Sequence, residues 1–323
     1  MTNRRKFLKN SGALAAAGLL LPRLYAESIT KKFAPMNRLG VGLFTLPKSL
    51  ENDFAGTLKM VSKIGYKEVE FFGPYSFSAN EEIEGWKKAA PILGFSGSGF
   101  YGHEAKEVKS LLDANGLRAP SMHIGLITLK QNMDKLAQAA HAIGATYVVL
   151  PSAQTPPDLD GYKKQAEEFN QIGASAAKHG LRFARHNHGN GLKELSGKIP
   201  MELILEQTDP KLVYFQMDLF WTIAGGIDPA AWLTKYAGRY RMLHIKDMAK
   251  AVHFSGDGNT VNEWMELLPY ATEAGSGVLD LKSILASAQQ SGVEHYFVEQ
   301  DRASNPQESL EKSYRYLAGL QKA

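Results

Sequence analysis

Cysteine is absent from all 323 residues of this chain. No disulfide can stabilise the fold, so its stability has to come from a sizeable hydrophobic core. The same absence excludes a thiol nucleophile and thiolate metal ligands. A metal site in this protein would have to be built from imidazole nitrogen and carboxylate oxygen.

Long apolar runs are also missing beyond the N-terminus, so we expect no membrane-spanning helix there. The first 26 residues resemble the twin-arginine export signal of bacteria. Arg4 and Arg5 precede the apolar stretch 13–21, and a small-residue cleavage site ends at Ala26. The resemblance implies periplasmic localisation, cleavage near Ala26 and contact with the membrane only during export. The alternative is an N-terminal membrane anchor, for which the apolar run is short.

The sequence therefore divides into a signal peptide (1–26), a linker (27–38) and one folded domain (39–323). Residues 1–26 hold five basic residues and no acidic one, so the rest carries 32 Lys and Arg against 33 Asp and Glu, a net charge of −1. A nearly neutral chain lacks the electrostatic footprint of a nucleic-acid binder. We expect no nucleic-acid partner.

Short apolar runs alternate with helical patterns along the whole domain. Most runs have four to six residues bounded by Gly or Pro, as buried parallel strands do. They are Leu39–Phe44, Val69–Phe72, Pro120–Ile124, Tyr147–Leu150, Leu181–Ala184, Val213–Met217, Tyr240–Leu243 and Tyr296–Val298.

The helical patterns between these runs often end at Gly. They cover Phe54–Ile64, Glu104–Asn115, Gln131–Ile143, Tyr162–His179, Pro200–Gln207, Pro229–Tyr236, Leu281–Gln290 and Pro306–Leu320. Eight such repeats predict an α/β fold, a (β/α)8 TIM barrel in a single domain. A doubly wound sheet is the alternative, but the first strand is not followed by a Gly-rich phosphate fingerprint.

Two connections are longer than the others. Residues 73–101 include an extra helix around Glu82–Leu93, and residues 248–278 are rich in Gly, Asp and aromatic residues. In a barrel both follow strand ends, so we expect them to cover the catalytic face.

Polar residues close most of the predicted strands, and in a barrel such residues point at its catalytic mouth. They are Glu70, His123, His186, His188, Asp218, His244 and Glu299. Oxygen and nitrogen donors of this kind suit a divalent cation such as Mn, Co, Zn or Mg. Each residue alone has an ordinary structural interpretation, a helix cap for Asp218 or a hydrogen-bonded core side chain for His244. The metal hypothesis depends on their convergence from neighbouring strands.

Other residues near the strand ends are candidates for substrate binding. They are Glu70, His123, Lys246, Trp221 and Arg302. Lys246 could bind and polarise a hydroxyl-rich substrate, or form a surface ion pair with Asp247. Arg302 could reach a substrate oxygen or pair with Asp301. For Glu70, a structural salt bridge is the alternative.

These segments resemble the xylose-isomerase-like barrel superfamily, often labelled sugar phosphate isomerase/epimerase. The resemblance rests on GYKEVEF at Glu70, APSMH at His123, RHNH on strand five, FQMDLFW at Asp218, GRYRMLHIKD at His244 and YFVEQD at Glu299. It implies a metal held by Asp218, His244 and Glu299. The family takes its fourth ligand from a Glu on strand five, where this chain has Gly191. We expect His188 there instead, with His186 as the alternative ligand and otherwise a proton-transfer or substrate-contacting residue.

The resemblance also implies a reaction. A divalent metal acidifies the proton next to a ketone, and Glu299 and His186 move that proton through an enediolate. We expect isomerisation or epimerisation of a small, non-phosphorylated keto-sugar in the periplasm. The alternatives are a 3-keto-glycoside lyase or hydrolase that works by β-elimination at the same site, and a non-catalytic sugar-binding barrel. A homo-oligomer is compatible with this prediction.

Overall fold

The computed structural model describes residues 38–320, and these form a closed barrel of eight parallel strands. Around the barrel the strands follow the order β1-β10-β7-β6-β5-β4-β3-β2, which is their sequence order apart from a small separate sheet. The barrel strands are β1 (Leu39–Gly42), β2 (Glu68–Phe72), β3 (Arg118–His123), β4 (Tyr147–Leu150), β5 (Arg182–His186), β6 (Val213–Asp218), β7 (Tyr240–Ile245) and β10 (His295–Val298). The predicted fold is confirmed.

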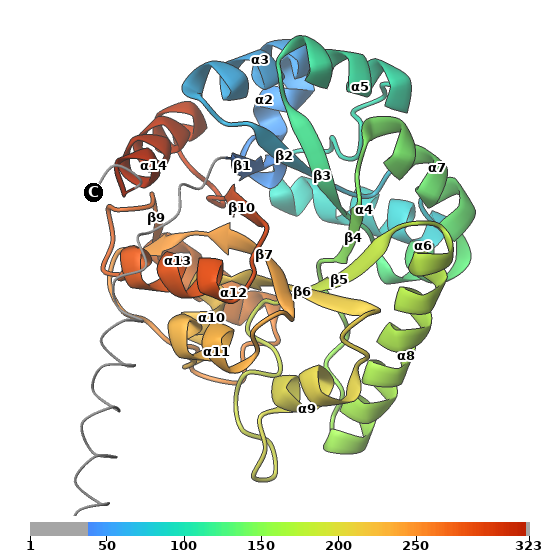
Figure 1. The fold of residues 1–323 in the computed structure, drawn as a ribbon. Helices are drawn as coiled ribbons and strands as arrows, with labels where there is room; N and C mark the ends of the chain where they lie inside the picture. The colour runs from blue at the N-terminus through green and yellow to red at the C-terminus, as the bar shows by residue number, and fades with distance from the viewer. Residues whose placement is uncertain (1–37, 321–323) are drawn as a thin grey trace, which may run out of the picture. The chain divides into compact units, whose positions relative to one another are not determined.

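An outer ring of helices surrounds these strands (Figure 1). The ring consists of α3 (Phe54–Ile64), α5 (Ala105–Ala114), α7 (Met133–Ile143), α8 (Leu159–Lys178), α9 (Pro200–Gln207), α11 (Pro229–Lys235), α13 (Leu281–Gln290) and α14 (Pro306–Leu320). Local signals fix their ends. Asp53 accepts a hydrogen bond from the Gly56 amide at the start of α3, and Gly65 follows its last residue with φ of +125°.

Several shorter elements were not predicted. They are η1 (Leu43–Thr45), α2 (Pro47–Asn52), α6 (Leu126–Gln131), α10 (Leu219–Ala224), α12 (Val261–Leu267) and η2 (Leu268–Tyr270). The extra helix expected after strand two is present as α4 (Asn80–Leu93). With three to seven residues each, the missed elements complete at most two turns, too few for a hydrophobic period to be recognised.

An apolar cluster fills part of the barrel interior. Tyr147, Val149, Ala184, Met242 and Phe297 form one buried cluster there. Gly40 allows this packing, because a Cβ at that position would lie 2.5 Å from the Phe297 ring. The polar residues above the cluster are therefore shut off from solvent on the lower side.

The strand register brings the polar residues together toward the carboxyl end of the barrel. Asp218 is paired with His244 across β6 and β7, and His186 is paired with Gln216 across β5 and β6. On the other side of the barrel, Gly42 lies beside Glu70. All of these residues are at or near the carboxyl ends of their strands, where barrel enzymes place their sites.

Asp247 holds the longer of the two loops against the barrel. Its carboxylate accepts backbone N–H bonds from Met248, Gly275, Gly277 and Leu279, at 2.8–3.2 Å. The same loop contains the small antiparallel sheet of β8 (Asp247–Met248) and β9 (Ala271–Thr272), followed along the chain by α13. The segment that carries α12 is therefore anchored at both ends.

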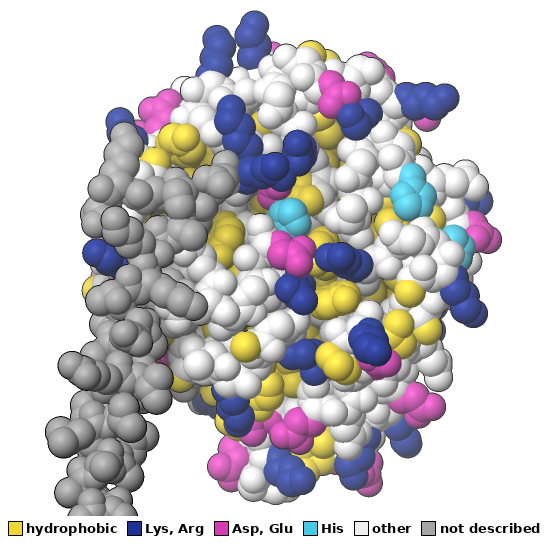
Figure 2. Space-filling view, viewed as in Figure 1, with side chains coloured by type: hydrophobic (Ala, Val, Ile, Leu, Met, Phe, Trp, Pro, Cys, Tyr) yellow, Lys and Arg dark blue, Asp and Glu magenta, His cyan; other side chains and the backbone are white. Residues whose placement is uncertain are grey.

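On the face shown in Figure 2, basic and acidic side chains are interspersed, with hydrophobic side chains between them. Within residues 38–320 no helix is long and apolar enough to cross a membrane. The predicted signal peptide and residues 27–37 of the linker lie outside the described residues.

Candidate active site

Three potential metal ligands meet at the carboxyl ends of β6, β7 and β10. Asp218, His244 and Glu299 each offer one donor atom, and these atoms all lie within 4.8 Å of one another. His244 Nδ1 is 3.1 Å from Glu299 Oε2 and 4.0 Å from Asp218 Oδ2. All three side chains are buried.

Asp218 is both a helix cap and a candidate ligand. Its Oδ1 accepts a hydrogen bond from the Trp221 amide and so caps α10. Its Oδ2 has no hydrogen-bond partner of good geometry among residues 38–320, although the Lys246 ammonium lies 2.9 Å away. The two interpretations of this residue are compatible, because each uses a different oxygen.

Lys246 reaches the same carboxylates from the end of β7. Its Nζ lies 2.9 Å from Asp218, 2.8 Å from Glu299 and 2.8 Å from Asp301. Burial lowers the pKa of Lys246, but these carboxylates outweigh it and raise the pKa well above its usual value. The alternative pairings considered for Lys246 and Arg302 are not formed, since Asp247 binds backbone N–H groups and Asp301 binds Lys246.

Glu70 lies behind His244. Its Oε2 is 2.5 Å from His244 Nε2 and 3.1 Å from His123 Nε2. Its Oε1 accepts hydrogen bonds from Gln216 and Ser121. Burial raises the pKa of Glu70, but the two histidines outweigh it and lower that pKa well below the usual range. With both oxygens engaged, Glu70 orients His244, the arrangement common for a metal-binding histidine.

The charges of this site do not balance. Four carboxylates, Glu70, Asp218, Glu299 and Asp301, face three groups that can carry a positive charge, Lys246, His244 and His123. Burial lowers the pKa of His244, but the Glu299 and Glu70 carboxylates raise it to about 10. Even with His244 protonated, negative charge is in excess, and a cation would neutralise it. The donor set, with an Asp218 oxygen that has only the Lys246 ammonium close to it, fits a divalent metal.

Strand five delivers histidines but no carboxylate. His186 Nδ1 lies 3.0 Å from Gln216 Oε1, and the rings of His186 and His188 are 5.0 Å apart. His188 packs on Trp264, with ring centroids 4.8 Å apart. Among the described residues, His188 joins no group with ligand spacing, whereas His186 joins His123 and His244 in a second group. Gly191, the position at which the resemblance predicts a Glu, has φ of +79°, a conformation unfavourable for residues other than Gly.

A cavity of about 680 Å³ opens above the site. The candidate residues that line it are His123, His186, His188, Trp221, Lys246, Glu299 and Arg302. Glu70, Asp218 and His244 lie behind this surface. A substrate in the cavity would therefore contact the lining residues directly and would reach Glu70, Asp218 and His244 only through them.

Sequence reasoning missed two residues that shape the site. Gln216 is fully buried and joins Glu70, His123 and His186 in one hydrogen-bond network. It is two positions before Asp218, so strand parity could have identified it. Gly42 leaves room for the Glu299 carboxylate, because a Cβ at position 42 would lie 2.7 Å from Glu299 Oε1. No polar group marks Gly42 in the sequence.

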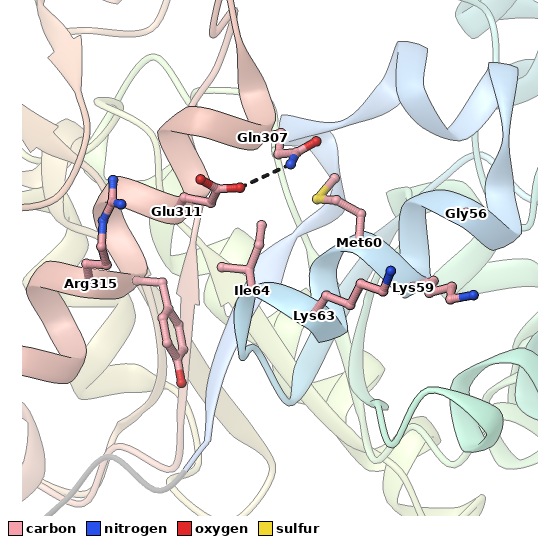
Figure 3. Close-up of a pocket in the computed structure, with 9 residues that line it drawn as sticks. Gly56, Lys59, Met60, Lys63, Ile64, Gln307, Glu311 and Arg315 are labelled. Carbon is pink, nitrogen blue, oxygen red and sulfur yellow. Dashed lines mark hydrogen bonds between the residues drawn. The ribbon is translucent and has the colours of Figure 1, made fainter.

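A second hollow of about 470 Å³ lies between α3 and α14, on the outside of the barrel. Figure 3 shows Met60 and Ile64 of α3 on the side of Gln307 and Glu311 of α14, whereas the Lys59 side chain extends away from α14. Glu311 accepts a hydrogen bond from Gln307 within α14. This hollow shares no residue with the catalytic cavity.

The geometry defines a class of protein, a (β/α)8 barrel with a candidate metal centre at the carboxyl ends of its strands. The family described as xylose isomerase-like TIM barrel matches residues 58–320, and the chain belongs to this family.

Relatives and solved structures agree with this membership. An inosose dehydratase of Geobacillus thermodenitrificans is 26% identical over 250 residues, covering 67% of this chain and 81% of that protein. A sugar phosphate isomerase/epimerase from Parabacteroides distasonis superposes with a TM-score of 0.68 at 25% identity, covering 88% of this chain and 95% of the other. The IolI protein, solved with a zinc atom, has a TM-score of 0.62 at 15% identity over 88% of this chain and 98% of its own, a likeness of fold.

Proposed function

We propose that this protein is a divalent-metal-dependent lyase that removes water or another β-leaving group from a keto-sugar or a cyclic keto-polyol. One observation carries the proposal: two cavity-lining histidines that burial keeps neutral, His186 on β5 and His188 just after it, lie at the end of the same strand. Epimerisation needs proton transfer on two faces of the substrate, whereas elimination can use one. The inosose dehydratase relatives support this choice of the lyase over the isomerase expected first.

His186 is the proposed base. Gln216 donates its amide N–H to Glu70 Oε1, so the Gln216 carbonyl oxygen must accept the proton on His186 Nδ1. His186 Nε2 then keeps its lone pair. Burial lowers the pKa of His186 well below its usual value, so the ring is neutral. A neutral imidazole with a free nitrogen can take the proton next to a ketone.

Glu299 is held as an anion. Burial raises its pKa, but Lys246 and His244 outweigh this and lower the pKa well below the usual range. Such a carboxylate is a good cation ligand. We assign Glu299 to binding the metal with Asp218 and His244, and the metal, when bound, would supply Lewis-acid polarisation of the ketone oxygen.

Lys246 stabilises the negative charge that develops on the ketone oxygen, since its ammonium lines the cavity and stays protonated. His186 then returns its proton to the departing hydroxyl, which leaves as water. The C–H and C–O bonds break, and a C=C bond conjugated to the ketone forms. Where the leaving group is an alcohol, the same step releases an aglycone.

The test uses inosose and a 3-keto-glucoside, each incubated with metal-loaded protein in D₂O. We expect the absorbance of a conjugated enone and loss of the β-hydroxyl or aglycone by NMR. His186→Gln should slow this at least about 100-fold, while the neighbouring His188→Gln keeps more activity. Deuterium incorporation with every substituent retained would instead support the second candidate, an isomerase or epimerase. If neither deuterium exchange nor elimination occurs with any substrate, the protein is a sugar-binding barrel without catalytic activity.

We also propose that this chemistry takes place in the periplasm, on a substrate without phosphate. The proposal rests on Arg4, Arg5 and the apolar stretch that follows them. The metal could be Mn, Co, Zn or Mg.

A further inference from the structure

Exposed apolar side chains are concentrated on two helices near the catalytic cavity. Among the described residues, the exposed large hydrophobic side chains are Ile92, Val261, Met265 and Val278. Ile92 is on α4, and Val261 and Met265 are on α12. These helices belong to the two long loops, and both contribute to the cavity lining. Of these four side chains, Val261 and Met265 line the cavity itself, and exposed apolar surface in a groove is one mark of an apolar ligand site.

Aromatic rings form one wall of this cavity. The wall consists of Phe44, Phe72, Trp86 and Phe95, contributed by η1, β2, α4 and the loop after α4. Neighbouring rings in this aromatic wall contact each other, with centroids 5.1 Å apart for Phe44–Phe72 and 5.8 Å for Trp86–Phe95. Mutual packing holds the rings in place, so little side-chain freedom would be lost when a ligand binds.

The wall presents hydrocarbon rather than hydrogen-bonding groups. The indole N–H of Trp86 already donates to the Ser96 carbonyl oxygen, at 2.6 Å. Val261, Trp264 and Met265 of α12 and Leu268 of η2 add further apolar surface to the same cavity. The cavity thus combines a polar floor of histidines, Lys246 and Glu299 with a second, apolar region.

The volume is larger than a single sugar ring needs. About 680 Å³ lies well inside the range of sites that hold drug-sized ligands, roughly 300–1,000 Å³. A free keto-sugar on the polar floor would leave the aromatic wall and the α12 side chains in contact with water only.

We propose that the apolar region is a subsite for the aglycone of a glycoside, and that this aglycone is an aromatic ring. The assignment of the sugar to the polar floor rests on the function proposed above. The aromatic ring lies between the aromatic wall and the apolar side chains of α12. Burying a ring of this size should increase affinity about ten- to a hundredfold.

Binding of unreactive glycosides tests the subsite without catalysis. Calorimetry compares 4-nitrophenyl β-D-glucoside with methyl β-D-glucoside on the metal-loaded protein. We expect the aryl glycoside to bind at least about tenfold more tightly. Val261→Ser should reduce this preference several-fold, and Trp86→Leu should reduce it further. Val278→Ser is the matched control, because Val278 is 58% exposed against 62% for Val261 but does not line the cavity.

Equal affinity for the two glycosides would overturn the subsite, as would equal effects of Val261→Ser and Val278→Ser. Val261 is exposed, so its replacement does not threaten folding. An aryl preference without elimination on any keto-substrate would keep the subsite and refute the proposed reaction. Elimination without an aryl preference would support the proposed reaction and refute the subsite.

Discussion

Replacing Glu70 by Gln should weaken metal binding although Glu70 is not a ligand. Glu70 accepts at four contacts, from His244, His123, Gln216 and Ser121. An amide of the same shape offers one oxygen and one NH₂, so at least one neighbouring donor would face another donor. His244 would lose the partner that fixes its ring and raises its pKa.

Two magnitudes follow from this geometry. Loss of the carboxylate behind a metal-binding histidine lowers metal affinity about 10- to 100-fold. Removing one partner of a buried charged pair costs about 3–5 kcal/mol of stability. The assays are calorimetric titration of EDTA-treated protein with Mn²⁺, Co²⁺ or Zn²⁺, and urea unfolding of the same samples.

Glu68 provides the matched control. It lies on the same strand, is buried to the same degree and contacts His295 Nδ1 at 2.7 Å near the opposite end of the barrel. Glu68→Gln should lower stability but leave metal affinity within about twofold of the wild type. If Glu70→Gln and Glu68→Gln have the same metal affinity, Glu70 does not orient the metal site and our reasoning is wrong.

Four further predictions concern the ligands, the floor and the N-terminus. Asp218→Asn should remove bound metal in elemental analysis, whereas Asp228→Asn, at the cap of α11, should not; metal retained in both would refute the ligand role. Gly42→Ala should displace the Glu299 carboxylate and reduce metal affinity, while Gly85→Ala, with open space around it, should leave affinity unchanged. The metal-free protein should lose stability as pH falls below about 6.5, because the unfolded His186 binds a proton whereas the buried ring stays neutral. His186 contributes at most about 1.4 kcal/mol of this loss per pH unit. Urea midpoints that stay the same between pH 7 and 5, in the wild type and in His186→Gln alike, would contradict this. Replacing Arg4 and Arg5 by Lys should retain the protein in the cytoplasm on fractionation, and unchanged periplasmic recovery would argue against twin-arginine export.

Helix boundaries could be predicted from the sequence where a capping residue or a terminating Gly marks them. The helix Phe54–Ile64 was predicted to the residue, since Asp53 precedes it and Gly65 follows it. α10 was missed because its six residues are apolar or small and follow Asp218 directly, so they have neither a polar face nor a separate start signal. Tertiary packing, not local preference, forms this helix.

For the site, strand parity predicted correctly which residues meet at one end of the barrel. It did not predict which of them line the cavity and which lie behind its surface. Glu70 and His123 have the same kind of strand-end position, yet only His123 lines the cavity. Depth depends on the register between strands and on small residues such as Gly42, which a single strand does not reveal. The partner of Lys246 was unpredictable for the same reason, since Asp301 is 55 positions away and follows β10.

Lys246 and Asp247 are neighbours in sequence, but their side chains bind different parts of the structure. Lys246 binds the carboxylates of the floor, while Asp247 binds the amides of the loop that carries α12. Because one peptide unit joins Lys246 and Asp247, a movement at the end of β7 would affect both the carboxylates of the floor and the loop that carries α12. Loss of the floor charges should therefore loosen the loop, and amide hydrogen exchange would detect the two as one cooperative unit. The α12 loop would then report on the charge state of the site.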